Sequence, residues 1–230
     1  MNPNMNPNLT EIAYILDRSG SMEPMTEAAI TGFNAFLQQQ LDEPGDVNFS
    51  LLLFDNEFLA VNKRTPLQDV RPLDATVYIP RGSTSLLDAI GLTIDELGVQ
   101  IAAEPEEKRP AKVVFAIYTD GYENSSTRYT LEKINAMITH QRTKYGWEFL
   151  FLAANQDAIA TAAKLGIAAH NSATYLADGI GTRTTTGSLH RKMKALRKQG
   201  APPLPPEEQA DLHAPMDQIV RDEDQKRRGH

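Results

Sequence analysis

The sequence predicts an α/β fold: a doubly wound, mostly parallel central sheet with one antiparallel edge strand and helices on both faces. Apolar runs alternate along the chain with segments of helical hydrophobic spacing, which is the pattern of β-α-β units. The apolar runs are continuous, as expected for strands that helices cover on both faces. A length of 230 residues and a hydrophobic content of 41% suffice for one large domain with its own core.

The individual elements follow from the spacing of apolar residues. Short continuous runs predict strands, and apolar residues three or four positions apart predict helices. In chain order the predicted elements are strand 12–16, helix 30–41, strands 49–54 and 58–61, helix 86–97, strand 113–118, helix 131–138, strand 149–152, helix 158–165, strand 167–175 and helix 189–196.

Turn residues mark where these elements stop. Pro44-Gly45 ends the first helix, and Asp55-Asn56 forms a tight turn between strands 49–54 and 58–61. The two strands therefore predict a hairpin whose second arm is the antiparallel edge. Residues 62–80 contain several prolines and are expected to be irregular.

The two ends of the chain differ in composition from the middle. Residues 1–8 repeat the polar sequence Met-Asn-Pro-Asn and are expected to form a flexible arm. Residues 199–230 begin with a proline-rich linker, and their remainder alternates acidic and basic residues. We expect this charged tail to be disordered, or to form a short helix at 207–213 that docks only on a partner. The folded domain is assigned to 9–198.

Composition and charge exclude several classes of function. The formal net charge of -7, from 30 acidic and 23 basic residues, argues against a nucleic-acid partner. Without cysteine there is no disulfide, thiolate metal site or thiol nucleophile. No apolar run approaches the roughly 20 residues that a membrane helix needs, and the N-terminus does not resemble a signal peptide. We therefore expect no membrane partner and a cytoplasmic location.

Oxygen-bearing side chains follow two of the predicted strands. Asp17, Ser19 and Ser21 come after strand 12–16, and Asp120 comes after strand 113–118. Because ligands of open α/β sheets bind beyond the carboxyl ends of the strands, these side chains are well placed for a hard cation. Taken alone, the first group is explained equally well as a helix N-cap.

A hydroxyl-rich loop lies between these two strand ends in the sequence. It is the segment 81–85, which opens helix 86–97 and contains Thr84. Thr84 also has the features of a helix N-cap, because Asp88 follows at roughly capping-box spacing. The combination of this loop with two strands that end in an acidic residue favours a divided cation site.

These three loops resemble a von Willebrand factor type A (vWA) domain with a metal ion-dependent adhesion site (MIDAS), in the form found in compact bacterial or phage members. The resemblance covers roughly residues 9 to 198. The matching motifs are Asp17-Arg18-Ser19-Gly20-Ser21 for the family's Asp-x-Ser-x-Ser loop, Gly82-Ser83-Thr84 for its threonine loop and Thr119-Asp120-Gly121 for its second aspartate loop.

The resemblance implies a metal site with five ligand positions. Ser19, Ser21 and Thr84 would offer hydroxyl oxygens, while Asp17 and Asp120 would act directly or through ordered water. Oxygen donors without a thiolate or a suitably spaced histidine pair favour Mg²⁺ over Zn²⁺, and Mn²⁺ is able to substitute. Ca²⁺ usually takes more ligands.

The resemblance also implies a non-enzymatic module that binds proteins. Neutral hydroxyl ligands leave the charge of the ion poorly compensated, so an Asp or Glu of a partner protein would gain a strong contact by completing the coordination. Some members of the family work beside an ATPase partner.

Two alternatives remain open at this point. The first is a Mg²⁺-dependent hydrolase or phosphotransferase with Asp17 or Asp120 as nucleophile, although no phosphate-binding loop is present. The second is an ion with a mainly structural role, so that the partner docks on the basic helix 191–198 or on the tail. If no partner docks on that helix, we expect it to be solvated. Arg18 is either solvated or selects acidic partners at the site. Glu123 is either solvated or an extra carboxylate of the site.

Overall fold

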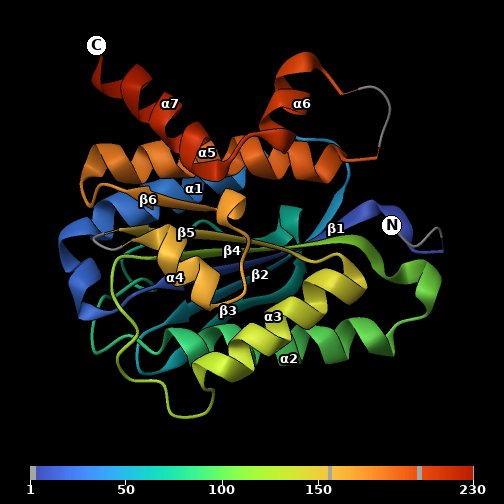
Figure 1. Ribbon diagram of the computed structural model, residues 1–230, viewed down its shortest axis with the longest axis horizontal. Helices are drawn as coiled ribbons and strands as arrows, with labels where there is room; N and C mark the ends of the chain where they lie inside the picture. Colours follow the sequence, from blue (N-terminus) through green and yellow to red (C-terminus); the bar gives the residue numbers. More distant parts are fainter. Residues whose placement is uncertain (1–3, 155–156, 201–203, 230) are drawn as a thin grey trace.

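A six-stranded sheet forms the centre of the protein (Figure 1). The computed structural model describes residues 4–154, 157–200 and 204–229. The strand order is β3-β2-β1-β4-β5-β6, and neighbouring strands are parallel except for the antiparallel pair β2 and β3. The predicted fold class is confirmed. The strands are β1 (Asn6–Asp17), β2 (Asp46–Phe54), β3 (Phe58–Pro66), β4 (Pro110–Thr119), β5 (Glu148–Ala154) and β6 (Ser172–Tyr175).

Helices cover both faces of the sheet, and two more helices lie outside them (Figure 1). One face carries α1 (Thr26–Leu41) and α5 (Gly179–Lys198), and the other carries α2 (Leu86–Ala103), α3 (Leu131–Tyr145) and α4 (Ala158–Lys164). The outer helices α6 (Pro206–His213) and α7 (Met216–Arg228) pack on α5. Short 3-10 helices occupy Gly20–Met25, Leu67–Asp69, Glu106–Lys108 and Ala169–Asn171. None of the helices in the described part of the chain is long and apolar enough to cross a membrane.

The position of β1 between two layers of helices explains why its sequence is a continuous apolar run. Tyr14 faces the α1 side, where its ring centroid lies 5.4 Å from that of Phe33. Its neighbours Ala13 and Ile15 face the α2 side, and all of these side chains are buried. Because successive side chains of a strand point to opposite faces, a strand covered on both sides needs apolar residues at every position.

The chain reverses its direction across the sheet between β1 and β4. It leaves β1 for β2 and β3 on one side and then crosses through α2 to β4 on the other side. The ends of the two strands are therefore adjacent, with Leu16 opposite Tyr118 in the register. This is the kind of crevice in which open α/β sheets bind their ligands.

Two expectations for the first half of the chain need correction. The strand β1 begins at Asn6, so residues 6–8 of the expected arm belong to the sheet; residues 1–3 lie outside the described part. The Asn6 N–H donates to the carbonyl oxygen of Arg109 (2.9 Å), which fixes this end of the strand. The strand β3 extends to Pro66, so residues 62–66 are not irregular.

The expectation of a linker and a disordered tail at 199–230 also differs from the structure. Residues 206–228 form α6 and α7, whereas residues 201–203, at the start of the expected linker, and residue 230 lie outside the described part. Met216, Ile219 and Val220 recur at helical spacing and are buried. These three apolar residues are enough to hold α7 on the domain, because they share the face of the helix that packs on α5.

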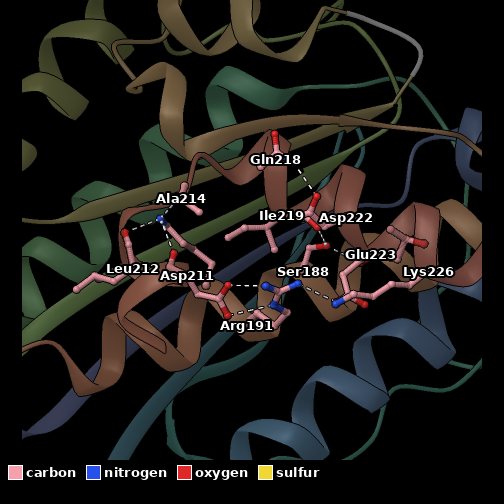
Figure 2. Close-up of polar contacts among 12 residues, drawn as sticks. Ser188, Arg191, Asp211, Leu212, Ala214, Gln218, Ile219, Asp222, Glu223 and Lys226 are labelled. Atoms are coloured by element: carbon pink, nitrogen blue, oxygen red, sulfur yellow. Dashed lines mark hydrogen bonds and ion pairs between the residues drawn. The ribbon is translucent and has the colours of Figure 1, made fainter. Parts of the chain in front are cut away.

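The basic segment of α5 was expected to be solvated, but two of its side chains, Lys192 and Arg197, are buried. The Lys192 ammonium donates to the carbonyl oxygens of Asp211, Leu212 and Ala214 at the end of α6, at distances between 2.8 and 3.1 Å. Figure 2 labels these three acceptors. Arg197 donates in the same way to carbonyl oxygens at the end of α1, including that of Gln40 (2.7 Å). Cations near helix C-termini are favourable, so both residues act as buried caps for neighbouring helices.

Candidate metal centre

The loop after β1 is organised by the carboxylate of Asp17. This side chain is fully buried, and its Oδ1 accepts a hydrogen bond from the Ser19 N–H (2.7 Å). Its Oδ2 accepts from the Thr119 hydroxyl of β4 (2.5 Å). Asp17 therefore shapes its own turn and also ties the end of β1 to the end of β4.

The serine hydroxyls of this loop are not used for helix capping. The 3-10 helix at Gly20–Met25 begins without a side-chain cap from Ser19, and α1 begins without one as well. Instead, Ser19 Oγ lies 3.1 Å from Ser21 Oγ. The Ser21 hydroxyl donates to Oδ1 of Asp120, which lies 2.7 Å away on the other side of the crevice.

Thr84 joins this group through the backbone of Gly121. A Cβ atom at position 121 would lie 3.2 Å from Thr84 Oγ1 and 3.4 Å from Ser21 Oγ, so both hydroxyls lie against this glycine. The Thr84 N–H donates to the side-chain oxygen of Asn124 (2.9 Å), and the Asn124 N–H donates to the Thr84 carbonyl (3.0 Å). The structure thus brings Asp17, Ser19, Ser21, Thr84 and Asp120 together at one place.

The expected capping box of α2 is absent. The helix begins after Ser85, with no side-chain cap on that residue, and Thr84 lies outside it. The Asp88 carboxylate accepts instead from the backbone N–H groups of Thr127, Arg128 and Tyr129, each at 2.9 Å. Asp88 therefore holds the long loop that follows Asp120 rather than the start of its own helix.

Glu123 has a structural role that neither of the two expectations described. Its carboxylate accepts from the backbone N–H of Leu87 (2.9 Å) in the first turn of α2. It also accepts from the N–H groups of Ser125 (3.0 Å) and Ser126 (2.7 Å). Glu123 is thus a helix cap supplied from outside α2, and it anchors the loop that carries Asp120 to the loop that carries Thr84.

Asp55 is the part of the site that sequence reasoning missed. It follows β2, it is fully buried, and its Oδ2 lies 3.1 Å from the Nε atoms of both Arg18 and Arg81. These arginines belong to the first two loops of the site, so Asp55 holds the two loops together. The signal was present, because the apolar run 49–54 ends in an acidic residue as the runs before Asp17 and Asp120 do. Arg18 is 5% exposed and thus does not select partners at the surface.

The two site carboxylates lie in surroundings that disfavour their negative charge. Burial raises the pKa of Asp17 to about 6, against the hydrogen bonds from Thr119 and Ser19 that lower it. Burial also raises the pKa of Asp120, whose partner Ser21 lowers it. A bound cation would favour the charged form of both groups.

The donor set fits a hard divalent ion. A hydroxyl has one proton to donate and two lone pairs, so Ser21 can donate to Asp120 and still offer a lone pair. Ser21 is exposed, whereas Ser19 and Thr84 are buried beneath it, which leaves one side of the group open to solvent. Among the described residues there is no group of three or more His, Cys, Asp or Glu side chains suited to a metal. Metal binding at this place would therefore depend on the hydroxyls.

Comparison with known proteins shows the fold. No protein-family model and no curated protein matches the sequence. A zinc-occupied MIDAS structure of proximal thread matrix protein 1 from the mussel byssus resembles the chain, with a TM-score of 0.55, 13% identity, and coverage of 80% of this chain and 47% of that one. For the manganese-loaded TRAP protein of Plasmodium vivax the TM-score is 0.54, with 14% identity and coverages of 74% and 70%.

A von Willebrand factor type A structure from Catenulispora acidiphila is similar as well. Its TM-score is 0.54 at 13% identity, and the match covers 82% of this chain and 43% of that one. The chain spans less than half the length of the mussel and Catenulispora structures. These likenesses, together with the sheet order, show that the chain has the vWA fold.

Proposed function

We propose that this protein is a non-enzymatic, magnesium-dependent module that binds another protein. Asp17, Ser19, Ser21, Thr84 and Asp120 would hold the ion, and the ion would capture an acidic residue of the partner. The observation that supports this most is the convergence of three hydroxyls and two carboxylates, from three separate loops, at the crevice between β1 and β4.

The arrangement of these residues suits capture of a carboxylate. Where Asp17 and Asp120 act through ordered water, a bound divalent ion would have only neutral hydroxyls of this chain as direct ligands, and these leave its charge poorly compensated. One oxygen of Asp17 accepts from the Ser19 N–H in its own loop and the other accepts from Thr119 of β4, while Ser21 and Asp120 come from opposite sides of the crevice. A partner's Asp or Glu can therefore approach from the solvent side without displacing a buried group.

The choice of metal rests on the chemistry of the donors. Carboxylate and hydroxyl oxygens suit Mg²⁺ and Mn²⁺ better than they suit Zn²⁺. However, one related fold has been solved loaded with manganese and another with a zinc-occupied MIDAS motif, so the three ions need direct comparison on this chain.

The alternative of a hydrolase or phosphotransferase has less support. Asp17 is fully buried, and both of its oxygens already accept hydrogen bonds, so it is poorly placed to attack a substrate. The basic residues of helix 191–198 are tied to other parts of the chain, which argues against that helix as the docking surface. We also propose that α6 and α7 belong to the folded unit.

Calorimetric titration of the purified chain with MgCl₂, MnCl₂ and ZnCl₂ tests the metal site. Asp120→Asn should weaken Mg²⁺ binding at least tenfold, because it removes one of the two site carboxylates. Glu27→Gln, which removes a carboxylate from the exposed surface of α1, is the matched control and should leave binding unchanged. Equal Mg²⁺ affinity of Asp120→Asn and the unaltered chain would refute the site.

Affinity capture from the source organism tests the second half of the proposal. The unaltered chain, Asp17→Ala and Glu27→Gln are each used as bait, with Mg²⁺ and again with chelator. A protein retained by the unaltered chain and Glu27→Gln only with Mg²⁺, and lost by Asp17→Ala, supports the module, and its identity shows whether it is an ATPase. Capture that persists in chelator overturns the proposed mechanism even where the metal titration succeeds.

A further inference from the structure

A groove lies between α1, α5 and α7, and it shares no lining residue with the candidate metal centre. Its volume is about 270 Å³. It is formed by four residues of α1, three of α5 and one of α7: Thr31, Gly32, Ala35, Gln39, Arg183, Thr186, Gly187 and Arg227. Two arginines on two different helices therefore line a small hollow, which we call the Arg183–Arg227 groove.

Arg183, one of the two arginines of this groove, differs from the other basic residues of α5 and α7. Arg191 pairs with Asp211 and Glu223, and Arg228 pairs with Asp178 and Asp224. The side chain of Arg183 makes no hydrogen bond or ion pair within the described residues, and it is exposed. In a protein with a formal net charge of -7, an unpaired cation beside a hollow is a notable local excess of positive charge.

An acidic group, Glu223, pairs weakly with Arg227 at the edge of the groove. Glu223 Oε2 lies 3.9 Å from Nε of Arg227, too far for a hydrogen bond. The other oxygen, Oε1, accepts from Arg191 (2.8 Å) and lies 3.4 Å from the Lys226 ammonium (Figure 2). The charge of Glu223 is thus shared among three cations, and Arg227 keeps most of its donors for another partner.

Two glycines bring the walls of the groove close together. A Cβ atom at position 187 would lie 3.2 Å from Nη2 of Arg227, so this guanidinium lies against the bare backbone of α5. A Cβ atom at position 32 would lie only 2.7 Å from Thr186 Oγ1, so α1 and α5 approach closely at the same level. The positions of the two helices and of the Arg227 guanidinium are therefore set by packing.

Gln39 supplies an independent sign of a missing partner. Its side-chain oxygen is buried, and no donor within the described residues reaches it. A buried polar atom without a partner is costly, by about 1 to 3 kcal/mol. Gln39 also lines the groove, so rotation of its side chain would bring this oxygen to a ligand that has anionic oxygens for the arginines and a hydroxyl proton for Gln39.

We propose that the Arg183–Arg227 groove binds a phosphate group, either as hydrogen phosphate or as a phosphate monoester. Guanidinium groups recognise such oxyanions through paired N–H donors, and two of them from different helices can hold one phosphate from both sides. The protonated oxygen of the phosphate donates to Gln39. The groove is smaller than the roughly 300 to 1,000 Å³ of drug-sized pockets, which favours a single small group over a large ligand.

The test is a titration of the full chain with inorganic phosphate, followed by amide chemical shifts at constant ionic strength and with chelator present. Glycerol 3-phosphate represents the monoester, and sulfate represents an oxyanion with no proton to donate. We expect saturable binding of phosphate, of the monoester, or of both. Sulfate should bind more weakly, and Gln39→Ala should reduce the difference between phosphate and sulfate.

Variants locate the binding. The double variant Arg183→Gln/Arg227→Gln should weaken binding at least tenfold, whereas Arg221→Gln, which removes an exposed arginine of α7 that pairs with Asp217, should change it less than twofold. The single variant Arg183→Gln, which removes an exposed and unpaired side chain, should weaken binding severalfold and serves if the double variant does not fold. Shifts that do not saturate, or equal binding by Arg183→Gln and the unaltered chain, would overturn the proposal.

Discussion

The hydroxyl of Ser21 donates a hydrogen bond of 2.7 Å to Oδ1 of Asp120, although 99 positions separate the two residues in the sequence. Ser21 comes from the loop after β1, and Asp120 comes from the loop after β4. This contact spans the crevice where the chain reverses direction across the sheet. It also places a hydroxyl lone pair and a carboxylate next to each other, as an oxygen-coordinated cation requires.

Ser21→Ala should lower Mg²⁺ affinity by a factor of about 10 to 100, the range seen when a group that orients a metal ligand is removed. The variant loses one oxygen donor and frees the Asp120 carboxylate to rotate. Because Ser21 is exposed, the free energy of unfolding in chelator should change by less than about 1 kcal/mol. Calorimetry gives the affinity and urea unfolding gives the stability. An unchanged affinity would show that this hydroxyl is not a ligand.

Asp55→Asn should destabilise the fold by about 3 to 5 kcal/mol, the cost of breaking a buried ion pair. The change leaves the guanidinium of Arg18, which is 5% exposed, without its counter-charge. Urea unfolding in chelator measures the loss independently of any metal. The control is Glu57→Gln, which removes the other carboxylate paired with Arg81; that carboxylate is exposed and should cost less than about 1 kcal/mol. Equal effects of the two variants would contradict the role of Asp55.

The contribution of Glu11 to stability should fall as the pH rises from about 4.5 to 7. Burial raises the pKa of this carboxyl to about 7, although Arg64 at 2.9 Å lowers it. Between these pH values the folded chain binds a proton that the unfolded chain has released. The free energy of unfolding therefore decreases through this window, by an amount on the order of 3 kcal/mol, and the contribution is constant above it.

Urea unfolding of the unaltered chain and of Glu11→Gln at several pH values between 4 and 8 checks this dependence. The glutamine has no proton to lose, so the difference in stability between the two chains should change through the window. Glu107→Gln, at an exposed position, should keep the slope of the unaltered chain. Parallel stability profiles for the unaltered chain and Glu11→Gln would be incompatible with a raised pKa of Glu11.

Met216→Ala should destabilise the protein by about 2 to 5 kcal/mol, as expected for a large buried side chain cut back to alanine. Met216 is fully buried where α7 packs on the α1 and α5 side of the core. A disordered tail would instead tolerate the change without effect. Thermal and urea unfolding distinguish the two outcomes, and Lys226→Ala on the exposed side of α7 is the control.

The order and type of the main elements could be read from the sequence because local spacing encodes them. The apolar run of β1 is continuous since both of its faces are covered, and the acidic residue that ends it marks the edge of the sheet. The same reasoning placed Asp17, Ser19, Ser21 and Asp120 at one edge of the sheet, and the resemblance to vWA domains implied the full set of five with Thr84. The structure places these five side chains together there. Their role as metal ligands stays a prediction.

The tertiary structure alone decided which charged groups are paired and which segments are covered. Arg197 reaches Gln40 across 157 positions, and Arg191 reaches Glu223 from another helix, so no local pattern reveals either contact. The tail looked disordered because α7 has only a narrow apolar stripe, whose value depends on the surface of α5 that receives it. The spacing of apolar residues along the chain determines helices and strands because it is local. The free energy of a buried charge or a docked helix depends instead on partners that only folding brings near.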